Sequence, residues 1–290
     1  MPKAKIGVIG GTGLYQIEGL TDIEEVNSTT PFGKPSDTIT IGRLEGTSVA
    51  FLPRHGRGHT ITPTEVPYRA NIYALKALGV ERIISVNAVG SFQQEIKLGD
   101  LVIPDQIIDR TRQRPNTFFG DGLVVHIPFA DPFCPDLSRI LYEAAKETEA
   151  RVHFKGTYVA MEGPAFSTRA ESKLYRSWGA AIIGMTALPE AKLAREAEIC
   201  YAAIAGVTDY DSWREGDHPF NIDAILKVLR QNVDNIKPII KLAVARIPEE
   251  RGCDCASALK DAIATSRQNI TAPIRKKLDL LIGKYLKGDS

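Results

Sequence analysis

The amino-acid sequence predicts an α/β protein with a mixed, mainly parallel central sheet flanked by helices, folded as a single domain. Short apolar runs alternate with helical segments along the whole chain, as is typical of sheets covered by helices on both faces. The 290 residues suffice for one large core, and the hydrophobic content of 43% and charged content of 24% are ordinary for a globular protein. Repeats, low-complexity tracts and interdomain linkers are absent from the sequence.

Continuous apolar runs indicate the strands, and apolar residues at three- and four-residue spacing indicate the helices. The expected strands are 5–9, 48–52, 83–86, 101–108, 157–161, 181–185 and 202–207. The expected helices are 66–78, 137–149, 168–178, 189–199, 223–245 and 256–286. Residues 1–245 then form the α/β domain, and residues 246–290 form a C-terminal helical segment packed on it. The loop 111–136 is too long for a plain connection and is expected to act as a lid or a subunit contact.

Charge and hydropathy exclude several classes of protein. The formal net charge is +1, which argues against a dedicated partner of nucleic acid or of acidic membranes. No apolar run approaches the roughly 20 residues that cross a bilayer. The N-terminus leads directly into a strand without a secretory signal, so a cytoplasmic location is expected.

Two carboxylates follow the apolar run 202–207. Side chains alternate along an extended chain, so Asp209 and Asp211 are expected to point the same way and Tyr210 elsewhere. The carboxyl end of a buried strand is where open α/β sheets bind ligands. Paired acids suit a group with both donors and a proton-accepting nitrogen, such as the edge of an aminopurine. A helix cap or surface turn is the plain alternative.

Two further strand ends carry groups suited to an anion. Backbone N–H groups of Gly10-Gly11-Thr12-Gly13 can bind phosphate, and a plain tight turn is the alternative. A dinucleotide fingerprint would need a third glycine where Gln16 stands. Arg54 and His55 belong to a basic run after the strand 48–52. The arginine fork suits phosphate oxygens, although such runs are often solvated loops.

Five motifs together resemble the methylthioadenosine phosphorylases, a branch of the trimeric purine nucleoside phosphorylase family. The motifs stand in the family's order and are Gly10-Gly11-Thr12-Gly13, Pro53-Arg54-His55-Gly56, Glu162-Gly163-Pro164-Ala165-Phe166-Ser167, Met185-Thr186-Ala187-Leu188-Pro189-Glu190 and Thr208-Asp209-Tyr210-Asp211. The matches run from about residue 5 to residue 245, most of the chain.

The resemblance implies a role for each matching residue. It assigns phosphate binding to Thr12, Arg54, His55, Asn87, Ala88 and Thr186. It assigns substrate binding to Phe166, Ser167, Met185, Asp209, Tyr210 and Asp211, with Asp209 as the catalytic residue. Core packing is the alternative for Phe166 and Met185, and Glu190 and Arg195 are expected on a solvated helix face.

Specificity is expected to depend on Ser167 and Ile222. In enzymes for 6-oxopurines a glutamate stands at the position of Ser167, whereas a neutral serine suits adenine. An aliphatic Ile222 favours a methylthio group, because burying a hydroxyl without a partner costs roughly 1–3 kcal/mol. His126 and Phe129 are expected to complete this pocket across a subunit interface. Asn87 departs from the animal methylthioadenosine enzymes, which carry threonine there, and matches ordinary purine nucleoside phosphorylases.

The resemblance therefore implies phosphorolysis of 5′-methylthioadenosine to adenine and 5-methylthioribose 1-phosphate, a pentosyl transfer in methionine and purine salvage. Inorganic phosphate is the co-substrate, and no cofactor or metal is expected. The expected assembly is a homotrimer or a dimer of trimers, and the partners are a nucleoside and phosphate. The alternatives are a phosphorylase for 6-oxopurine nucleosides or methylthioinosine, and a nucleoside-binding or NAD-linked protein without this activity.

The four cysteines leave their redox state open. Buried free thiols are the plain interpretation in a reducing compartment. Cys253-Asp254-Cys255 lacks the second ligand pair of a zinc site, so a metal is not expected there. A disulfide between Cys253 and Cys255, and another between Cys134 and Cys200, are the alternatives, because some family members from hot environments have such bonds.

Overall fold

The computed structural model describes residues 3–11, 13–14, 16–214 and 221–286. Its strands are β1 (Ile6–Gly10), β2 (Thr21–Val26), β3 (Ile39–Leu44), β4 (Thr47–Pro53), β5 (Arg82–Ser91), β6 (Leu101–Ile103), β7 (Gln106–Arg110), β8 (Val152–Phe154), β9 (Thr157–Met161), β10 (Ile182–Gly184) and β11 (Cys200–Tyr210). Its α-helices are α1 (Tyr68–Ala77), α2 (Pro135–Lys146), α3 (Arg169–Ser177), α4 (Ala187–Glu196), α5 (Ile222–Arg246) and α6 (Ala272–Leu286). Two short 3-10 helices, Asp254–Ser257 and Arg267–Asn269, lie between α5 and α6.

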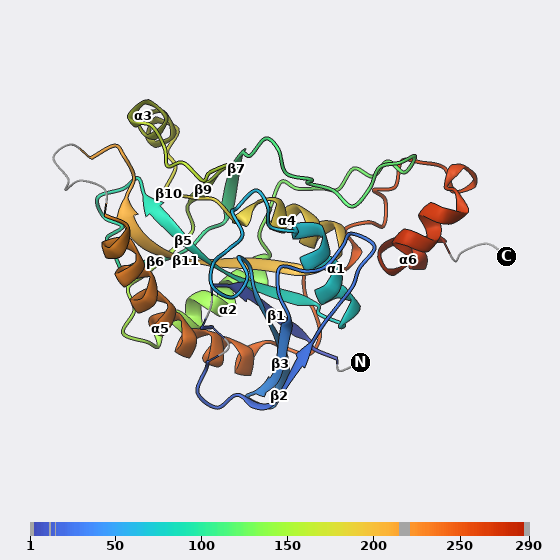
Figure 1. Cartoon of the computed structure of the whole chain (residues 1–290), viewed down its shortest axis with the longest axis horizontal. Coiled ribbons are helices and arrows are strands. Elements are labelled where there is room, and N and C mark those ends of the chain that lie inside the picture. Colours follow the sequence, from blue (N-terminus) through green and yellow to red (C-terminus); the bar gives the residue numbers. More distant parts are fainter. Residues whose placement is uncertain (1–2, 12, 15, 215–220, 287–290) are drawn as a thin grey trace.

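The strands form one 11-stranded sheet centred on β5. The parallel strand β11 pairs with β5 along its whole length. On the other side, the first half of β5 pairs with the parallel β1 and its last residues pair with the antiparallel β10. The sheet continues through β4, β3 and β2 on one side and through β9 and β7 on the other. Parallel pairings predominate, with antiparallel ones at β2–β3, β3–β4, β5–β10 and β6–β11. The predicted fold class, a mixed and mainly parallel sheet flanked by helices, is confirmed (Figure 1).

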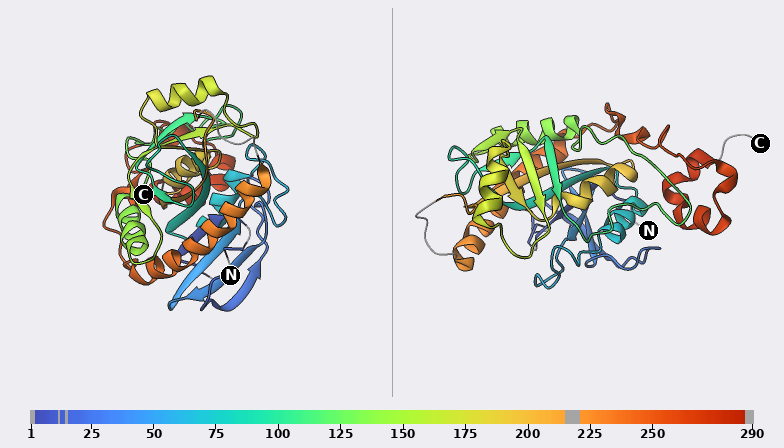
Figure 2. Two further views of the ribbon diagram at one scale, coloured as in Figure 1. Left: turned by 90° about the vertical axis from the view of Figure 1, so that its left-hand side faces the viewer. Right: turned by 90° about the horizontal axis from the view of Figure 1, so that it is seen from above.

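Helices cover the sheet on both faces. Ile83 of β5 belongs to the same buried cluster as residues of α1 and α4, whereas the next residue, Ile84, belongs to a cluster with residues of α2 and α5. Neighbouring residues of a strand point to opposite faces, so α1 and α4 lie on one face and α2 and α5 on the other. Figure 2 shows α5 running along the outside of the sheet.

The register between β5 and β11 positions the expected site. The two strands pair in parallel from Arg82 and Cys200 onward, and the register shifts between Val207 and Asp209. Such a bulge re-aims the side chains that follow it. It places Asp209 opposite Gly90 at the carboxyl end of both strands.

The structure corrects several expected elements. The run 101–108 is two strands, β6 and β7, because Pro104-Asp105 interrupts it, and the two strands pair with different neighbours. The expectation of a single long helix over 256–286 was wrong. In this segment the structure has only the two short 3-10 helices and α6. The polar edge strand β2 and the short β8 lack the apolar run that would have revealed them.

The long segment after β7 runs away from the sheet toward α6 (Figures 1 and 2). Val125 pairs with Ile263 in an isolated bridge, and the backbone N–H of His126 donates to the carbonyl of Ala262 at 2.8 Å. This arm, residues 111–134, is therefore held by the C-terminal segment. Among the residues that the structure describes, no helix combines the length and the apolar character needed to span a membrane.

Candidate functional site

The strand ends that carry the expected site residues meet at one edge of the sheet. β1, β4, β5 and β11 are parallel, so their carboxyl ends lie together. The antiparallel β10 aligns Ile182 with Ser91 and Ile183 with Gly90. Continuing that alignment brings Thr186, just after β10, beside Asn87.

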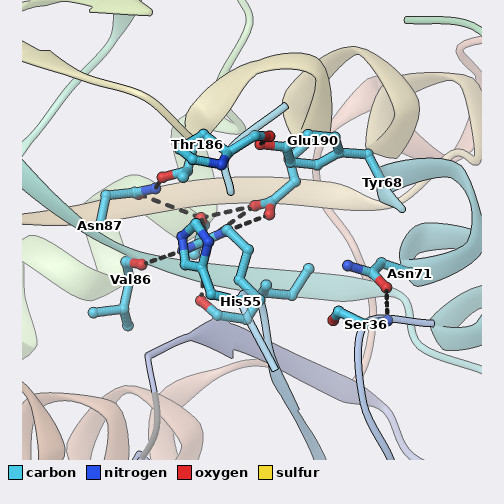
Figure 3. Close-up of polar contacts among 12 residues, drawn as sticks. Ser36, His55, Tyr68, Asn71, Val86, Asn87, Thr186 and Glu190 are labelled. Carbon is cyan, nitrogen blue, oxygen red and sulfur yellow. Dashed lines mark hydrogen bonds and ion pairs between the residues drawn. The ribbon is translucent and has the colours of Figure 1, made fainter. Parts of the chain in front are cut away.

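Asn87 and Thr186 form the polar centre of this edge. The Asn87 amide donates to Thr186 Oγ1 at 2.8 Å, and both side chains are buried. Figure 3 shows the two side chains pointing toward each other, with His55 beside them. Ala88 is exposed although every other residue of β5 is buried. The sheet is thus open to solvent at Ala88, next to these polar groups.

The geometry of His55 determines its tautomer. Its Nδ1 lies 2.8 Å from the carbonyl of Ile61, and a carbonyl only accepts, so Nδ1 carries the proton. Burial, together with the neighbouring Arg54 cation, lowers the pKa of His55 to about 4. At neutral pH His55 is therefore uncharged and its Nε2 offers a lone pair. A protonated phosphate oxygen is a group that can donate to it.

Arg54 forms a buried ion pair with Glu190. The Arg54 Nε lies 2.5 Å from Glu190 Oε1 and its Nη2 lies 3.0 Å from Oε2, and neither residue is more than 2% exposed. Oε2 also accepts from Tyr201 and Ser85. Burial alone would lower the pKa of Arg54, but the Glu190 carboxylate raises it.

This ion pair corrects the expected place of Glu190. The expected solvated helix face was wrong, because Glu190 is fully buried and its carboxylate points from α4 toward Arg54. The guanidinium also donates from Nη1 to the carbonyl of Val86 at 2.8 Å. Most of the Arg54 donors are thus engaged within the protein, and its charge lies at the base of the site.

Asp209 and Asp211 lie on the same side of β11, as the alternation of side chains predicts. A Cβ added to Gly90 would stand 3.1 Å from Asp209 Oδ2 and 3.5 Å from Asp211 Cβ. Glycine at position 90 therefore leaves room for both acids. Tyr210 instead stacks edge-on against Trp213, with ring centroids 5.9 Å apart.

Burial raises the pKa of both carboxyl groups. For Asp209 the hydrogen bond from Thr208 Oγ1 at 2.7 Å opposes the shift, and the charge of Asp211 adds to it. For Asp211 the nearby Ser172 and Ser167 hydroxyls oppose it. Within the described part of the chain, Asp211 Oδ2 is buried without a hydrogen-bond partner. A carboxyl pair with raised pKa values can share a proton with a basic ring nitrogen.

The segments that would flank a base lie close by. Ser167 is buried, and its carbonyl accepts from Ser212 Oγ at 2.9 Å, which ties it to the segment after Asp211. Phe166 is 45% exposed, so simple core packing does not describe it. Met185 is half-buried, and a Cβ on Gly163 would stand 2.4 Å from its sulfur.

Ile222 begins α5 and is 49% exposed in the single chain. Thr12 lies outside the described residues. His126, on the arm, is exposed and Phe129 is half-buried, and the arm leads away from the acid pair of its own chain (Figure 1).

Comparison with known proteins decides the family. The profile of the phosphorylase superfamily matches residues 5–245. The chain belongs to the phosphorylase superfamily. A curated S-methyl-5′-thioadenosine phosphorylase of Geobacter sulfurreducens is 60% identical over 282 residues, 97% of this chain and 99% of that protein. Its counterpart from Thermosynechococcus vestitus is 54% identical over 287 residues, 98% of this chain and 99% of that protein.

Solved structures of this superfamily agree with the fold. A methylthioadenosine phosphorylase from an Antarctic soil metagenomic library superposes with a TM-score of 0.93 at 51% identity, covering 97% of this chain and 99% of that one. The Schistosoma mansoni methylthioadenosine phosphorylase in complex with adenine has a TM-score of 0.80 at 39% identity, covering 89% of this chain and 96% of that one.

The sequence did not reveal the roles of two residues that position the site. Glu190 carries the charge that balances Arg54, and Arg114 joins the base-flanking segments. Arg114 is buried, and its guanidinium donates to the carbonyls of Met185, Leu188 and Glu162. Glu190 and Arg114 each lie more than 50 positions along the chain from at least one of their partners. A single sequence contains no local pattern that predicts contacts between such distant residues.

Proposed function

We infer that the chain phosphorolyses 5′-methylthioadenosine to adenine and 5-methylthioribose 1-phosphate, and is thus a pentosyltransferase. The full-length similarity to S-methyl-5′-thioadenosine phosphorylases supports this most strongly. The structure adds an acid pair at the carboxyl end of β11, with Asp211 buried and Asp209 half-buried, beside a polar edge suited to phosphate. A phosphate oxygen attacks the anomeric carbon while the bond to the purine N9 breaks, and the purine leaves with the bonding electrons.

We propose that Asp209 stabilises the leaving purine by holding a proton at N7. Its raised pKa favours the protonated form needed for donation. Asp211, with its unpartnered oxygen, accepts a hydrogen bond from the exocyclic amino group. Phe166, Tyr210 and Met185 flank the base and sugar in this proposal, and Ser167 and Ile222 set specificity. These roles come from the family resemblance and from the positions of the residues.

We propose that phosphate is bound by Thr12, Arg54, His55, Asn87, Ala88 and Thr186. The exposed backbone at Ala88 allows close approach of an anion, and the charge of Arg54 lies behind it. Neutral His55 accepts a hydrogen bond from a phosphate hydroxyl at Nε2. Holding phosphate next to the anomeric carbon lowers the barrier through positioning and charge complementarity.

The reaction is tested by measuring purine release from methylthioadenosine, methylthioinosine, adenosine and inosine, each with and without phosphate. We expect phosphate-dependent release of adenine, fastest from methylthioadenosine. Faster release from the inosine compounds, which Asn87 would favour, would retain the phosphate site and overturn the proposed base recognition. Release that ignores phosphate would contradict phosphorolysis itself.

The pH dependence of kcat tests the acid role of Asp209. If the protonated carboxyl is required, kcat at saturating substrates falls as pH rises through its raised pKa. The charge of Asp211 contributes to that rise, so Asp211→Asn should move the alkaline limb to lower pH. The Asp209→Asn variant should lack this limb. A limb unchanged in both variants would contradict the assignment to Asp209.

We also propose a homotrimer or a dimer of trimers, in which the arm 111–134 carries His126 and Phe129 to the site of a neighbouring chain. The arm is directed away from its own acid pair and exposes Val124, 49% accessible. Light scattering should give a mass of three or six chains, and Val124→Glu should reduce it. A monomeric mass for the unmodified, active protein would contradict the proposal.

A further inference from the structure

Four cysteines from three distant segments meet at one place. Cys134 is the N-cap residue of α2, Cys200 begins β11, and Cys253 and Cys255 flank Asp254 after α5. The four sulfur atoms lie within 4.8 Å of one another. The expectation that Cys253 and Cys255 lack a second ligand pair was therefore wrong, because the fold supplies Cys134 and Cys200.

The sulfur positions fit a coordinated cation. Cys253 Sγ lies 3.6 Å from Cys134 Sγ and 3.3 Å from Cys200 Sγ, and all four residues are free thiols in the structure. A disulfide would need about 2.05 Å. In a tetrahedral zinc–thiolate site with bonds of about 2.3 Å, the sulfurs stand about 3.8 Å apart. The observed separations are much closer to the second value.

The setting is closed, as structural zinc sites are. Cys134, Cys200 and Cys255 are no more than 4% exposed, and Cys253 is half-buried. The backbone N–H of Cys134 donates to the carbonyl of Tyr201 at 2.7 Å. The start of α2 is thus fixed against the start of β11, which holds two of the thiols before the other two arrive.

We propose that Cys134, Cys200, Cys253 and Cys255 together bind one zinc ion as a structural site. Binding replaces the thiol protons with Zn²⁺ and involves no change of oxidation state. Four thiolates and Zn²⁺ leave two negative charges. Arg82, which is 5% exposed and pairs in register with Cys200, places a positive charge at this end of the sheet.

The ion would fasten the C-terminal segment to the sheet. Arg82 already holds this segment through the carbonyls of Pro248 and Glu250 at 2.7 and 3.0 Å. Through Cys253 and Cys255, a few residues further on, the zinc would also link this segment to α2 and β11. Cys200 and Asp209 lie at opposite ends of β11, about 30 Å apart at roughly 3.3 Å per residue. The site is therefore structural and separate from the acid pair.

The test is metal analysis of the untagged full-length protein, expressed with zinc in the medium and purified under reducing conditions. We expect about one zinc per chain by mass spectrometry. Replacement by Co²⁺ should give the absorption bands of a tetrahedral thiolate site. The double variant Cys253→Ser, Cys255→Ser should lose the metal and unfold at lower temperature, with purine release at 25 °C close to that of the unmodified protein.

Asp254→Asn is the matched control, because Asp254 lies between two of the ligands and should leave the zinc content unchanged. If the double variant does not fold, the zinc content and the Co²⁺ spectrum of the unmodified protein decide. Four thiols that titrate on unfolding, without bound metal, would overturn the proposal. So would two disulfides, or a stoichiometric metal other than zinc.

Discussion

Asp209→Asn is expected to lower kcat for methylthioadenosine by about 10²- to 10⁴-fold, the usual contribution of general acid catalysis. Asparagine keeps the size of the side chain and its hydrogen bond from Thr208, but it cannot share a proton with the purine. Phosphate affinity should be unchanged, because the polar pair of Asn87 and Thr186 is not altered. Steady-state kinetics and the protection from thermal unfolding by phosphate measure the two effects separately.

The control for this variant is Asp223→Asn, an exposed carboxylate in the first turn of α5, which should retain full activity. Turnover by Asp209→Asn within about threefold of the unmodified protein would remove Asp209 from the mechanism. Loss of phosphate protection as well would point to a disturbed fold rather than to lost proton donation.

Glu190→Ala is expected to destabilise the protein by about 3–5 kcal/mol, because it leaves the buried Arg54 cation without its partner. For a chain of this size such a loss lowers the unfolding midpoint by on the order of 10 °C. Thermal unfolding at a fixed protein concentration measures it. Glu143→Ala is the matched control: its ion pair with Lys146 is exposed and should contribute less than about 1 kcal/mol.

A double variant separates the structural role of this pair from its role in the site. Arg54→Met with Glu190→Leu replaces the buried ions by apolar groups of similar size, which is often neutral for stability. We expect the midpoint to recover but phosphorolysis to be lost, because the Arg54 guanidinium that we propose to bind phosphate is gone. Recovery of both would show that Arg54 contributes only to stability.

The sequence revealed those parts of the fold and site that depend on local patterns. Apolar runs located β1, β5 and β11, and side-chain alternation correctly placed Asp209 and Asp211 on one side. The polar edge strand β2 had no such pattern. The division of the chain at residue 246 remains a prediction.

The features that sequence reasoning missed arise from contacts between distant segments. Glu190 has the charge of a surface residue and is buried only because Arg54, 136 positions earlier, lies opposite it. The cysteine cluster likewise joins residues as far apart as 134 and 255. Neither pairing leaves a periodic signal in a single sequence.

The course of β5 has a consequence for how substrate specificity can change. Asn87 and Ala88 lie on the same strand as Gly90, which faces the acid pair. Three residues of a strand span about 10 Å, so the rigid backbone at the centre of the sheet fixes the separation between the proposed phosphate site and the proposed purine site. Ser167 and Ile222, by contrast, lie outside the strands. We therefore expect substitutions there to change the preferred base or sugar without moving the proposed phosphate site.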